Sequence, residues 1–517
     1  MNGASALLST LVANDVTVCF ANPGTTEMHL VAGLDELPAM RGILCLFEGV
    51  ATGAADGYAR VARRPAATLL HLGPGLANGW ANLHNARRAR VPLVNIVGDH
   101  ATHHGAYDAP LQSNVEALAS ALEGWYQRPL RSGELSTAVV QALRAAYGPP
   151  GRVATLVVPS DASWGELDAV PSRWPLVERD APRSVDPSTL DEAVAKLRQG
   201  NAALFLGGQL DQRQLALAQR VATATGARLI LETFPASVTR GAGVASPERL
   251  NYFSQFAQDQ IKDVATMVVL GTTRPVGFFA YPNVESAVVP SSCDVIDLAP
   301  PGVALSSALE ALCEATNAAP LVLETGEVPE EPEGELNARS FAAAVAATMP
   351  EDLIVVDESN TSGLHLYGAT RFAPPHELLT LTGGAIGFAL PVALGAAVAA
   401  ERRVLALESD GSMLYTAQAL WTMARENLDV TVVALSNRSY AILTMERRLV
   451  GESSADAASQ RLLDLENPRI DLAGLSRSLG VPAQTVTTAE QLVSALRRSY
   501  ATPGPAFIEA VLPKGFN

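Results

Sequence analysis

The sequence predicts an α/β protein made of three doubly wound parallel-sheet domains. In the first part of the chain, apolar runs such as VTVCFANPG, VPLVNIVGD and RVATLVVPS alternate with helical patterns. This alternation is typical of parallel strands joined by crossover helices. It returns in a second part with ARLILETFP and ATMVVLGTT, and in a third part with DLIVVDES and RVLALESDGS. A chain of 517 residues has room for about three such domains.

Two polar stretches mark the expected domain boundaries. The first, around residues 166–188, is rich in proline and charge, and the second, TGEVPEEPEGELN at 325–337, is too acidic to build a core. We therefore expect domains at residues 1–168, 186–324 and 338–517.

Composition excludes several classes of partner. The net charge of −16 argues against nucleic acid or an anionic membrane surface. The N-terminus has no basic segment before an apolar core, so no signal peptide is expected. The cysteines show no metal-ligand spacing, which indicates reduced thiols and a cytoplasmic protein; they are Cys19, Cys45, Cys293 and Cys313.

One stretch is long enough to cross a membrane. Residues 378–400 carry no charge over 23 positions. Glycines and a proline interrupt its first half, and no second segment of this kind exists. We therefore expect a buried loop that leads into a core helix, with no membrane partner.

A lone carboxylate, Asp410, follows the apolar run RVLALES and shares a small turn with Gly411 and Ser412. Ligands of parallel sheets bind beyond the carboxyl ends of the strands, where the amides that open the next helix attract anions. An aspartate repels an anion unless a divalent cation such as Mg²⁺ lies between them. Asn437 ends the next strand, 27 residues on, so one strand-helix-strand unit brings it beside Asp410. We expect Mg²⁺ on the side chains of Asp410 and Asn437 and the carbonyl of Ser439; the alternative is a helix cap and a plain strand end.

These residues carry a resemblance to a known family. ESDGS, centred on Asp410, and Ser436-Asn437 resemble the thiamine diphosphate motif, in which Gly-Asp-Gly is followed after a helix by Asn-Asn. Ser409 and Ser436 depart from the motif without removing a metal ligand. Over nearly its whole length the chain is similar to thiamine diphosphate enzymes of the acetolactate synthase, pyruvate oxidase and benzoylformate decarboxylase group. The resemblance implies thiamine diphosphate and Mg²⁺ as cofactors.

The same resemblance implies an organisation. The three domains become a pyrimidine-binding, a central and a diphosphate-binding domain. A homodimer or homotetramer is expected, with active sites between subunits, where Glu48 of one subunit and Asp410 of another act on one cofactor. The central segment 201–318 has no GxGxxG after its strands, so FAD is not expected.

Further cofactor contacts follow from the resemblance. Glu48, in CLFEGVATGAADGYAR, matches the glutamate that hydrogen-bonds the aminopyrimidine ring; a carboxylate in such an apolar, strand-like run needs a partner. In the loop TGGAIGFALP, Gly384 offers a carbonyl to the pyrimidine and Ile386 wedges the cofactor. Two runs resemble cofactor-proximal turns of the family: ANPGTTE at 21–27, with Pro23 and Gly24, and GPGLAN at 73–78, with Asn78. The remaining expected cofactor residues are Tyr440, Ala441 and Ile442.

Proton-transfer groups discriminate among the reactions of the group. His71, in LLHLGPG, resembles the histidine of benzoylformate decarboxylase-like members, and imidazole exchanges protons near neutral pH. His103 and His104 follow another strand; a structural or solvent-exposed role is the alternative for all three. Thr25 is expected to face the substrate.

The expected activity is non-oxidative decarboxylation of a 2-oxo acid, with carboligation as a further outcome. The substrate pocket is assigned to Thr25, His71, Ile442, Leu443 and Glu446. The branched side chains of Ile442 and Leu443 would narrow the pocket and favour an aliphatic acid. The alternatives are an acetolactate synthase-like transferase that condenses two 2-oxo acids, and a non-catalytic, cofactor-binding regulatory subunit.

Overall fold

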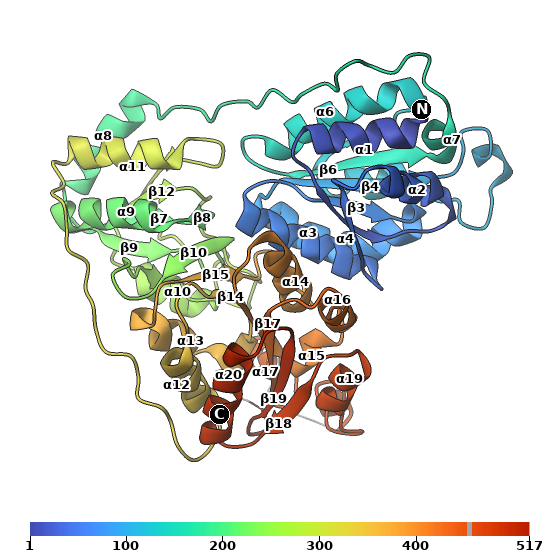
Figure 1. Cartoon of the computed structure of the whole chain (residues 1–517). Helices are drawn as coiled ribbons and strands as arrows, with labels where there is room; N and C mark the ends of the chain where they lie inside the picture. The colour runs from blue at the N-terminus through green and yellow to red at the C-terminus, as the bar shows by residue number, and fades with distance from the viewer. Residues whose placement is uncertain (452–456, 516–517) are drawn as a thin grey trace.

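The computed structural model describes residues 1–451 and 457–515. Figure 1 shows three bodies: the N-terminal segment at the upper right, the central segment at the left and the C-terminal segment below. Helix α7 ends at Trp164 and α8 begins at Pro187. Between these helices, a long extended segment of the chain connects the first two bodies.

The N-terminal segment forms a six-stranded parallel sheet in the order β2-β1-β3-β4-β6-β5. Its strands are β1 (Val18–Asn22), β2 (Arg41–Leu44), β3 (Ala67–Leu70), β4 (Leu93–Asp99), β5 (Trp125–Gln127) and β6 (Val153–Pro159). Separate apolar cores lie on its two faces, one built with α3 and α4 and the other with α1 and α6. The sheet is thus covered on both sides, as a doubly wound fold requires.

The helices of this segment are α1 (Gly3–Ala13), α2 (Met28–Glu36), α3 (Glu48–Ala62), α4 (Leu72–Ala89), α5 (Val115–Ser120), α6 (Leu135–Tyr147) and α7 (Ser160–Trp164).

The central segment forms a five-stranded parallel sheet in the order β11-β9-β7-β12-β13. The strands are β7 (Ala202–Leu206), β9 (Arg228–Leu231), β11 (Glu248–Arg249), β12 (Thr266–Leu270) and β13 (Asp294–Ala299). The helices are α8 (Pro187–Leu197), α9 (Gln212–Thr225), α10 (Ser254–Ile261) and α11 (Leu305–Ala315).

The third sheet has eight strands, in the order β18-β19-β17-β16-β14-β15-β10-β8. Six come from the C-terminal segment: β14 (Ile354–Glu358), β15 (His376–Thr380), β16 (Val404–Ser409), β17 (Val430–Ser436), β18 (Ala483–Val486) and β19 (Ala506–Val511). The other two, β8 (Gln209–Leu210) and β10 (Ser237–Arg240), come from the central segment, and β10 pairs with β15 antiparallel. The α/β class is confirmed, with this one antiparallel edge, which covers backbone groups that β15 would otherwise expose.

The helices of the C-terminal segment are α12 (Ala338–Thr348), α13 (Leu366–Ala369), α14 (Ala389–Ala399), α15 (Asp410–Met413), α16 (Ala419–Arg425), α17 (Ala441–Leu449), α18 (Ala457–Arg461), α19 (Leu472–Ser478) and α20 (Ala489–Ala501). The uncharged stretch 378–400 comprises the end of β15, a loop and the whole of the largely buried helix α14. Within the described ranges, no helix is long and apolar enough to cross a membrane.

Helices α3 and α14 cross closely and join the first and third bodies. A Cβ atom on Gly395 would lie 1.8 Å from the carbonyl oxygen of Ala54, and one on Gly57 would lie 2.1 Å from that of Val392. Only glycine permits this approach of the two backbones. The crossing places the first turn of α3 near the loop that precedes α14.

A buried ion pair fixes the same junction. Arg60 and Asp56 are one turn apart on α3, are fully buried and pair at 2.7 Å. The Arg60 guanidinium also donates to the carbonyl oxygens of Ala236 at 3.0 Å and Thr380 at 2.8 Å. One side chain therefore ties the N-terminal, central and C-terminal segments together.

Candidate active site

Glu48 is the first residue of α3, not part of a strand as its apolar surroundings suggested. Its side chain is buried, and Oε2 accepts a hydrogen bond from Asn78 Nδ2 at 3.0 Å. The free amides of a helix N-terminus favour a carboxylate at this position. Asn78 lies in α4, so the run GPGLAN, expected as a turn, is the beginning of a helix.

His71 precedes α4 and faces a buried carboxylate. Its Nδ1 lies 2.8 Å from Glu27 Oε2, and the Glu27 side chain has no exposed surface. The amide of Gly24 donates to the same oxygen at 2.7 Å. A Cβ on Gly24 would lie 2.3 Å from His71 Nδ1, so this loop needs glycine to approach the imidazole. Leu72, next in the chain, has φ +54, a strained conformation for a leucine and one that is common beside functional sites.

The other predicted residues of the N-terminal segment lie around this group or apart from it. Pro23 is half-buried and Thr25 exposed, both in the turn that carries Gly24. His103 and His104 lie on an exposed loop beyond β4; the His103 side chain is 72% exposed and its Nδ1 is 3.9 Å from Asp161 Oδ2. The structure brings Glu27 to His71, whereas the His103–His104 pair contacts neither.

Asp410 and Asn437 follow adjacent parallel strands, β16 and β17. Both side chains are buried. Asp410 Oδ2 accepts from the amide of Arg438 at 2.6 Å and Oδ1 from that of Gly411 at 2.9 Å. Asn437 Oδ1 accepts from the amide of Ser439 at 3.1 Å, which turns the chain back towards Asp410. The strand-helix-strand argument therefore places these two side chains correctly at one sheet edge.

The chemistry of this edge fits a divalent cation. Burial raises the pKa of Asp410 to about 6, against the opposing effect of the two amide donors. A carboxylate held in so dry a place is stabilised by a positive ion. Carboxylate, amide and carbonyl oxygens from Asp410, Asn437 and Ser439 are the hard ligands that Mg²⁺ prefers.

The loop before α14 is clamped by α4 of the N-terminal segment. Asn85 Nδ2 donates to the carbonyl of Ala385 at 2.9 Å, and His84 Nε2 lies 3.2 Å from that of Gly383. Gly384 has φ +74 and open space where a Cβ would stand, so a ligand can approach its backbone. Ile386 beside it is half-buried against the core.

Two buried glutamates, Glu358 and Glu408, support the far side of this loop. Glu358 accepts from the amides of Gly387 at 2.8 Å and of Phe388 and Ala389 at 2.7 Å. Glu408 is its register partner on the next strand, and burial raises the pKa of both carboxyls, that of Glu358 to about 7.

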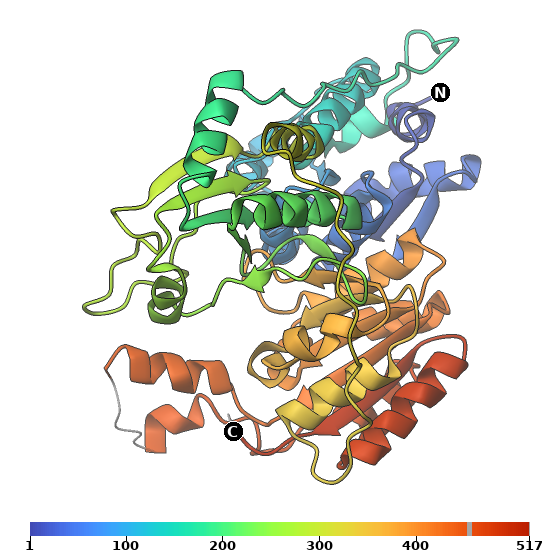
Figure 2. The ribbon, with the colours of Figure 1, turned by 90° about the vertical axis from the view of Figure 1, so that its left-hand side faces the viewer.

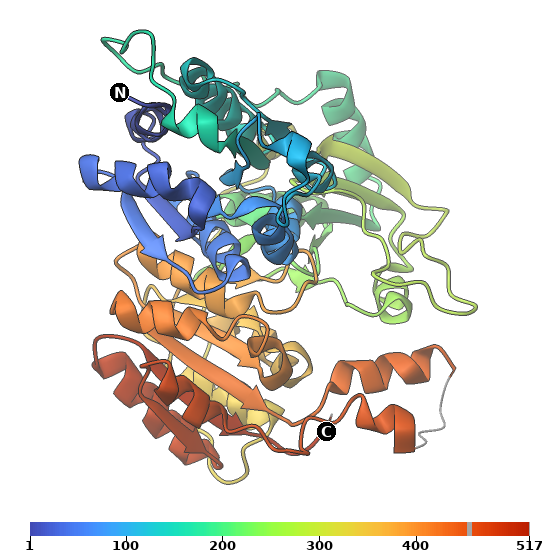
Figure 3. The ribbon, with the colours of Figure 1, turned by 90° about the vertical axis from the view of Figure 1, so that its right-hand side faces the viewer.

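The residues after Asn437 continue into α17. The ring of Tyr440 packs on the Gly411 turn, where a Cβ would lie 2.5 Å from Tyr440 Cε1. Ala441 begins the helix, Ile442 is half-buried and Leu443 is 46% exposed. Figures 2 and 3 show this helix projecting from the C-terminal sheet beneath the central segment.

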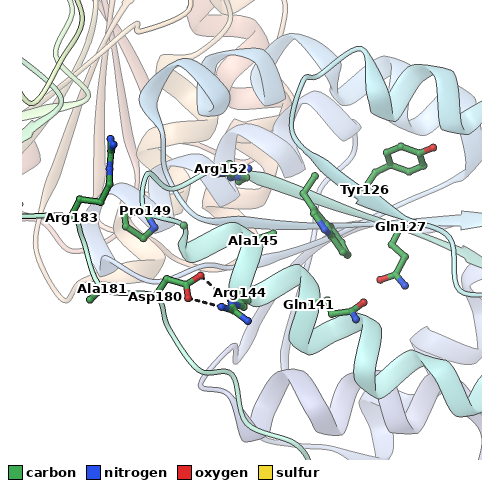
Figure 4. Close-up of a pocket in the computed structure, with 12 residues that line it drawn as sticks. Tyr126, Gln127, Gln141, Arg144, Ala145, Pro149, Arg152, Asp180, Ala181 and Arg183 are labelled. Atoms are coloured by element: carbon green, nitrogen blue, oxygen red, sulfur yellow. Dashed lines mark hydrogen bonds and ion pairs between the residues drawn. The ribbon is translucent and has the colours of Figure 1, made fainter. Parts of the chain in front are cut away.

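A large open cavity lies elsewhere, between α6 and the segment that leaves the N-terminal body. Its volume is about 760 Å³, and an ion pair between Arg144 and Asp180 spans one side (Figure 4). It is lined by none of the predicted site residues, and we assign the chemistry to the strand ends instead.

Comparison with known proteins decides the family. The model described as "Thiamine pyrophosphate enzyme, N-terminal TPP binding domain" matches residues 1–120, and its C-terminal counterpart matches residues 361–510. The chain belongs to the thiamine pyrophosphate enzymes. TPP denotes the same compound as thiamine diphosphate, so the family assignment and this cofactor are confirmed.

Two curated relatives place this thiamine pyrophosphate enzyme within the family. It is 49% identical over 99% of both chains to the Mycobacterium tuberculosis protein named "Putative acetolactate synthase large subunit IlvX". It is 29% identical over 98% of both chains to the benzoylformate decarboxylase of Pseudomonas aeruginosa. The chain is thus an enzyme of the acetolactate synthase and benzoylformate decarboxylase group, and nothing in the comparisons supports the non-catalytic alternative.

Solved structures agree on the fold. A thiamine diphosphate-dependent 4-hydroxybenzoylformate decarboxylase from Rhodococcus jostii matches with a TM-score of 0.86 at 23% identity, over all of both chains. The benzoylformate decarboxylase of Polynucleobacter necessarius matches with a TM-score of 0.83 at 21% identity, again over all of both chains.

The sequence analysis missed four residues that shape the site or its domain junction in this thiamine pyrophosphate enzyme. Glu27 stands in the quoted run ANPGTTE, but nothing local reveals that it is buried against His71. The other three contact residues that are far away along the chain. Asn85 contacts a residue 300 positions away, Arg60 one 320 positions away, and Glu358 residues 29 to 31 positions away. Only Glu358, at the end of the apolar run LIVVDE, carries a local signal, because a carboxylate there needs a partner.

Proposed function

We propose that this enzyme decarboxylates a 2-oxo acid without oxidation, using thiamine diphosphate and Mg²⁺, and that it also joins the product to a second carbonyl compound. The observation that carries the proposal is the imidazole of His71 held by the buried carboxylate of Glu27. A decarboxylase must return a proton to carbon, whereas a synthase supplies a second oxo acid instead.

The residues divide the work. Asp410, Asn437 and the carbonyl of Ser439 would hold Mg²⁺, and the Gly384 carbonyl and the Ile386 side chain would hold the pyrimidine end. Glu48 would keep a proton at the pyrimidine ring nitrogen. When bound, thiamine diphosphate would supply the nucleophilic carbon and the electron sink that decarboxylation of a 2-oxo acid needs.

His71 then completes the reaction. Glu27 accepts the proton of Nδ1, which leaves Nε2 free to face the substrate. The imidazolium form, protonated on both nitrogens, gives its Nε2 proton to the carbon that has lost CO₂, and the neutral imidazole that remains takes up a proton from water. The C1–C2 bond breaks, CO₂ leaves, and one proton is taken up for each aldehyde released. Thr25, exposed in the turn that carries Gly24, would face the substrate. His103 and His104, on the exposed loop after β4, are further candidates for proton transfer.

Two chains are needed for a complete site in this proposal. Within one chain, Glu48 accepts from Asn78 in α4, whereas Asp410 accepts from the amides of Gly411 and Arg438 at the strand ends of another sheet. A homodimer or homotetramer would bring Glu48 of one subunit to the Mg²⁺ edge of another.

A screen of 2-oxo acids tests the function. The protein, loaded with thiamine diphosphate and Mg²⁺, is given single acids while CO₂ and organic product are recorded together. Equimolar aldehyde and CO₂ support the decarboxylase. Acetolactate from pyruvate supports the second candidate, a transferase, which the 49% identity to the mycobacterial relative favours. Release of neither product would overturn both.

A further inference from the structure

A cluster of aromatic side chains lies on the central segment, outside the buried cores. The ring of Phe278 lies 5.4 Å from that of Phe234 and 5.0 Å from that of Tyr252, measured between centroids. Phe234 and Tyr252 also meet edge to face at 6.2 Å. Phe278 is 42% exposed, so the cluster presents an aromatic surface on which a flat apolar group can pack.

A carboxylate from another segment stands at this surface. Tyr281, from the central segment, donates its hydroxyl to Oε2 of Glu446 on α17 at 2.8 Å. Tyr252 is close enough that burial and the charge of Glu446 raise its pKa to about 12. Glu446 therefore lies beside Tyr252 of the cluster and is held there by the hydroxyl of Tyr281.

One oxygen of this carboxylate is left over. Glu446 Oε1 is buried and has no hydrogen-bond partner among the described residues. A buried charged acceptor without a donor costs free energy, and such an atom commonly marks a place where a ligand completes the bonding.

The position suits the far end of a substrate. Glu446 lies one helical turn after Ile442 on the same face of α17. It follows Ala441, the first residue of α17, by five residues, roughly 7.5 Å at a helical rise of 1.5 Å per residue. Figures 2 and 3 both place this helix beneath the central segment, in keeping with the hydrogen bond between Tyr281 and Glu446.

We propose that Glu446, Tyr252, Tyr281 and Phe278 form the subsite for the distal end of the 2-oxo acid, and that this subsite takes a flat apolar group ending in a hydrogen-bond donor. The donor is a hydroxyl or a charged nitrogen, which Glu446 Oε1 accepts. Because like charges repel, the carboxylate of the substrate points away from Glu446. This subsite rests on the proposed function and replaces the aliphatic preference that Ile442 and Leu443 suggested.

A set of matched substrates tests the subsite. Phenylglyoxylates with 4-hydroxyl, 4-aminomethyl or 4-methyl groups differ mainly in the distal donor. We expect the wild type to prefer one of the two donor-bearing acids over the 4-methyl acid by about 10- to 100-fold in kcat/KM, the range of a hydrogen bond to a charged group. Which of the two is preferred separates the neutral from the cationic donor.

Variants show whether Glu446 selects the substrate or only stabilises the contact between α17 and the central segment. Glu446→Leu is expected to abolish the preference for a distal donor. Arg448→Leu, at an exposed neighbour on α17, is the matched control and keeps the wild-type ratio. Tyr281→Phe tests the same carboxylate by a milder change and should reduce the ratio. An unchanged ratio in Glu446→Leu and Tyr281→Phe, or a wild type that favours the 4-methyl acid, would overturn the subsite.

Binding gives a second readout that needs no turnover. Calorimetry with 4-hydroxybenzoate, 4-(aminomethyl)benzoate and 4-methylbenzoate should show the same order for the wild type and its loss in Glu446→Gln, which keeps the shape of the side chain. If other 2-oxo acids are decarboxylated but this order is absent, the subsite is wrong and the function stands. If no 2-oxo acid is turned over, the function fails as well.

Discussion

The carboxylate of Glu27 lies 2.8 Å from Nδ1 of His71, and the glutamate side chain is completely buried. Glu27 lies in the short 3-10 helix after β1, and His71 directly follows the neighbouring strand β3; the two residues are 44 positions apart in the chain. An ionised carboxylate accepts only, so it keeps a proton on Nδ1 in both the neutral imidazole and the imidazolium, and leaves Nε2 for the proton transfer proposed above.

Glu27→Gln tests this positioning role. The amide keeps the size of the side chain but can donate to Nδ1 and so favour the opposite tautomer. We expect kcat to fall by about 10- to 100-fold with KM nearly unchanged, and His71→Ala to fall at least as far. Steady-state kinetics on the best acid of the screen measures both. A Glu27→Gln enzyme with wild-type kcat would show that the contact is only structural.

The buried pair of Asp56 and Arg60 should be a major contributor to stability. Asp56→Asn leaves the Arg60 charge buried without its partner, and we expect a loss of about 3–5 kcal/mol in the free energy of unfolding. The matched control is Asp180→Asn, which breaks the exposed pair with Arg144 and should leave the denaturation midpoint unchanged. Equal effects from the two substitutions in urea titrations would contradict the assigned burial.

The crossing of α3 and α14 should tolerate no side chain. Gly395→Ala places a Cβ 1.8 Å from the Ala54 carbonyl oxygen, and we expect a loss of about 1–3 kcal/mol. Gly368→Ala is the control, because no atom lies within 4 Å of its added Cβ and alanine favours the helix. Thermal melts should rank Gly395→Ala below the wild type and Gly368→Ala at or above it.

Stability should fall in acid partly through His376. Burial lowers the pKa of this imidazole from 6.5 to about 4, with a smaller contribution from Arg240. Between these values the unfolded chain binds a proton that the folded chain refuses, so stability decreases as pH falls from about 6.5 towards 4, by about 3 kcal/mol. His376→Gln should flatten this part of the curve, and His29→Gln, at an exposed site, should not. Identical pH profiles for wild type and His376→Gln would refute the assignment.

The sequence predicted what depends on short-range pattern. Strands and helices follow from hydrophobic periodicity, and Asp410 meets Asn437 because one strand-helix-strand unit has little freedom. The run GPGLAN misled because proline and glycine usually mark turns. Pro74 instead lies in the first turn of α4, where its missing amide costs no helical hydrogen bond.

The remaining features depend on contacts between distant segments. The pairing of β10 with β15, the clamp of Asn85 on the Ala385 backbone and the bond between Tyr281 and Glu446 each join residues more than a hundred positions apart. A single sequence carries no local trace of such pairings, because each partner by itself looks like an ordinary surface or strand residue. The domain limits at 1–168, 186–324 and 338–517 and the roles of individual site residues stay predictions.

Uptake of thiamine diphosphate by the purified protein tests the central claim most directly. Calorimetry with and without Mg²⁺, on the wild type, Asp410→Ala and Asn437→Ala, separates the metal ligands from the rest of the site, and Glu48→Gln serves as a variant that should still bind. The account predicts saturable binding that requires Mg²⁺ and is lost in Asp410→Ala. Binding by Asp410→Ala as tight as that of the wild type, or no binding by the wild type with Mg²⁺ present, would contradict it.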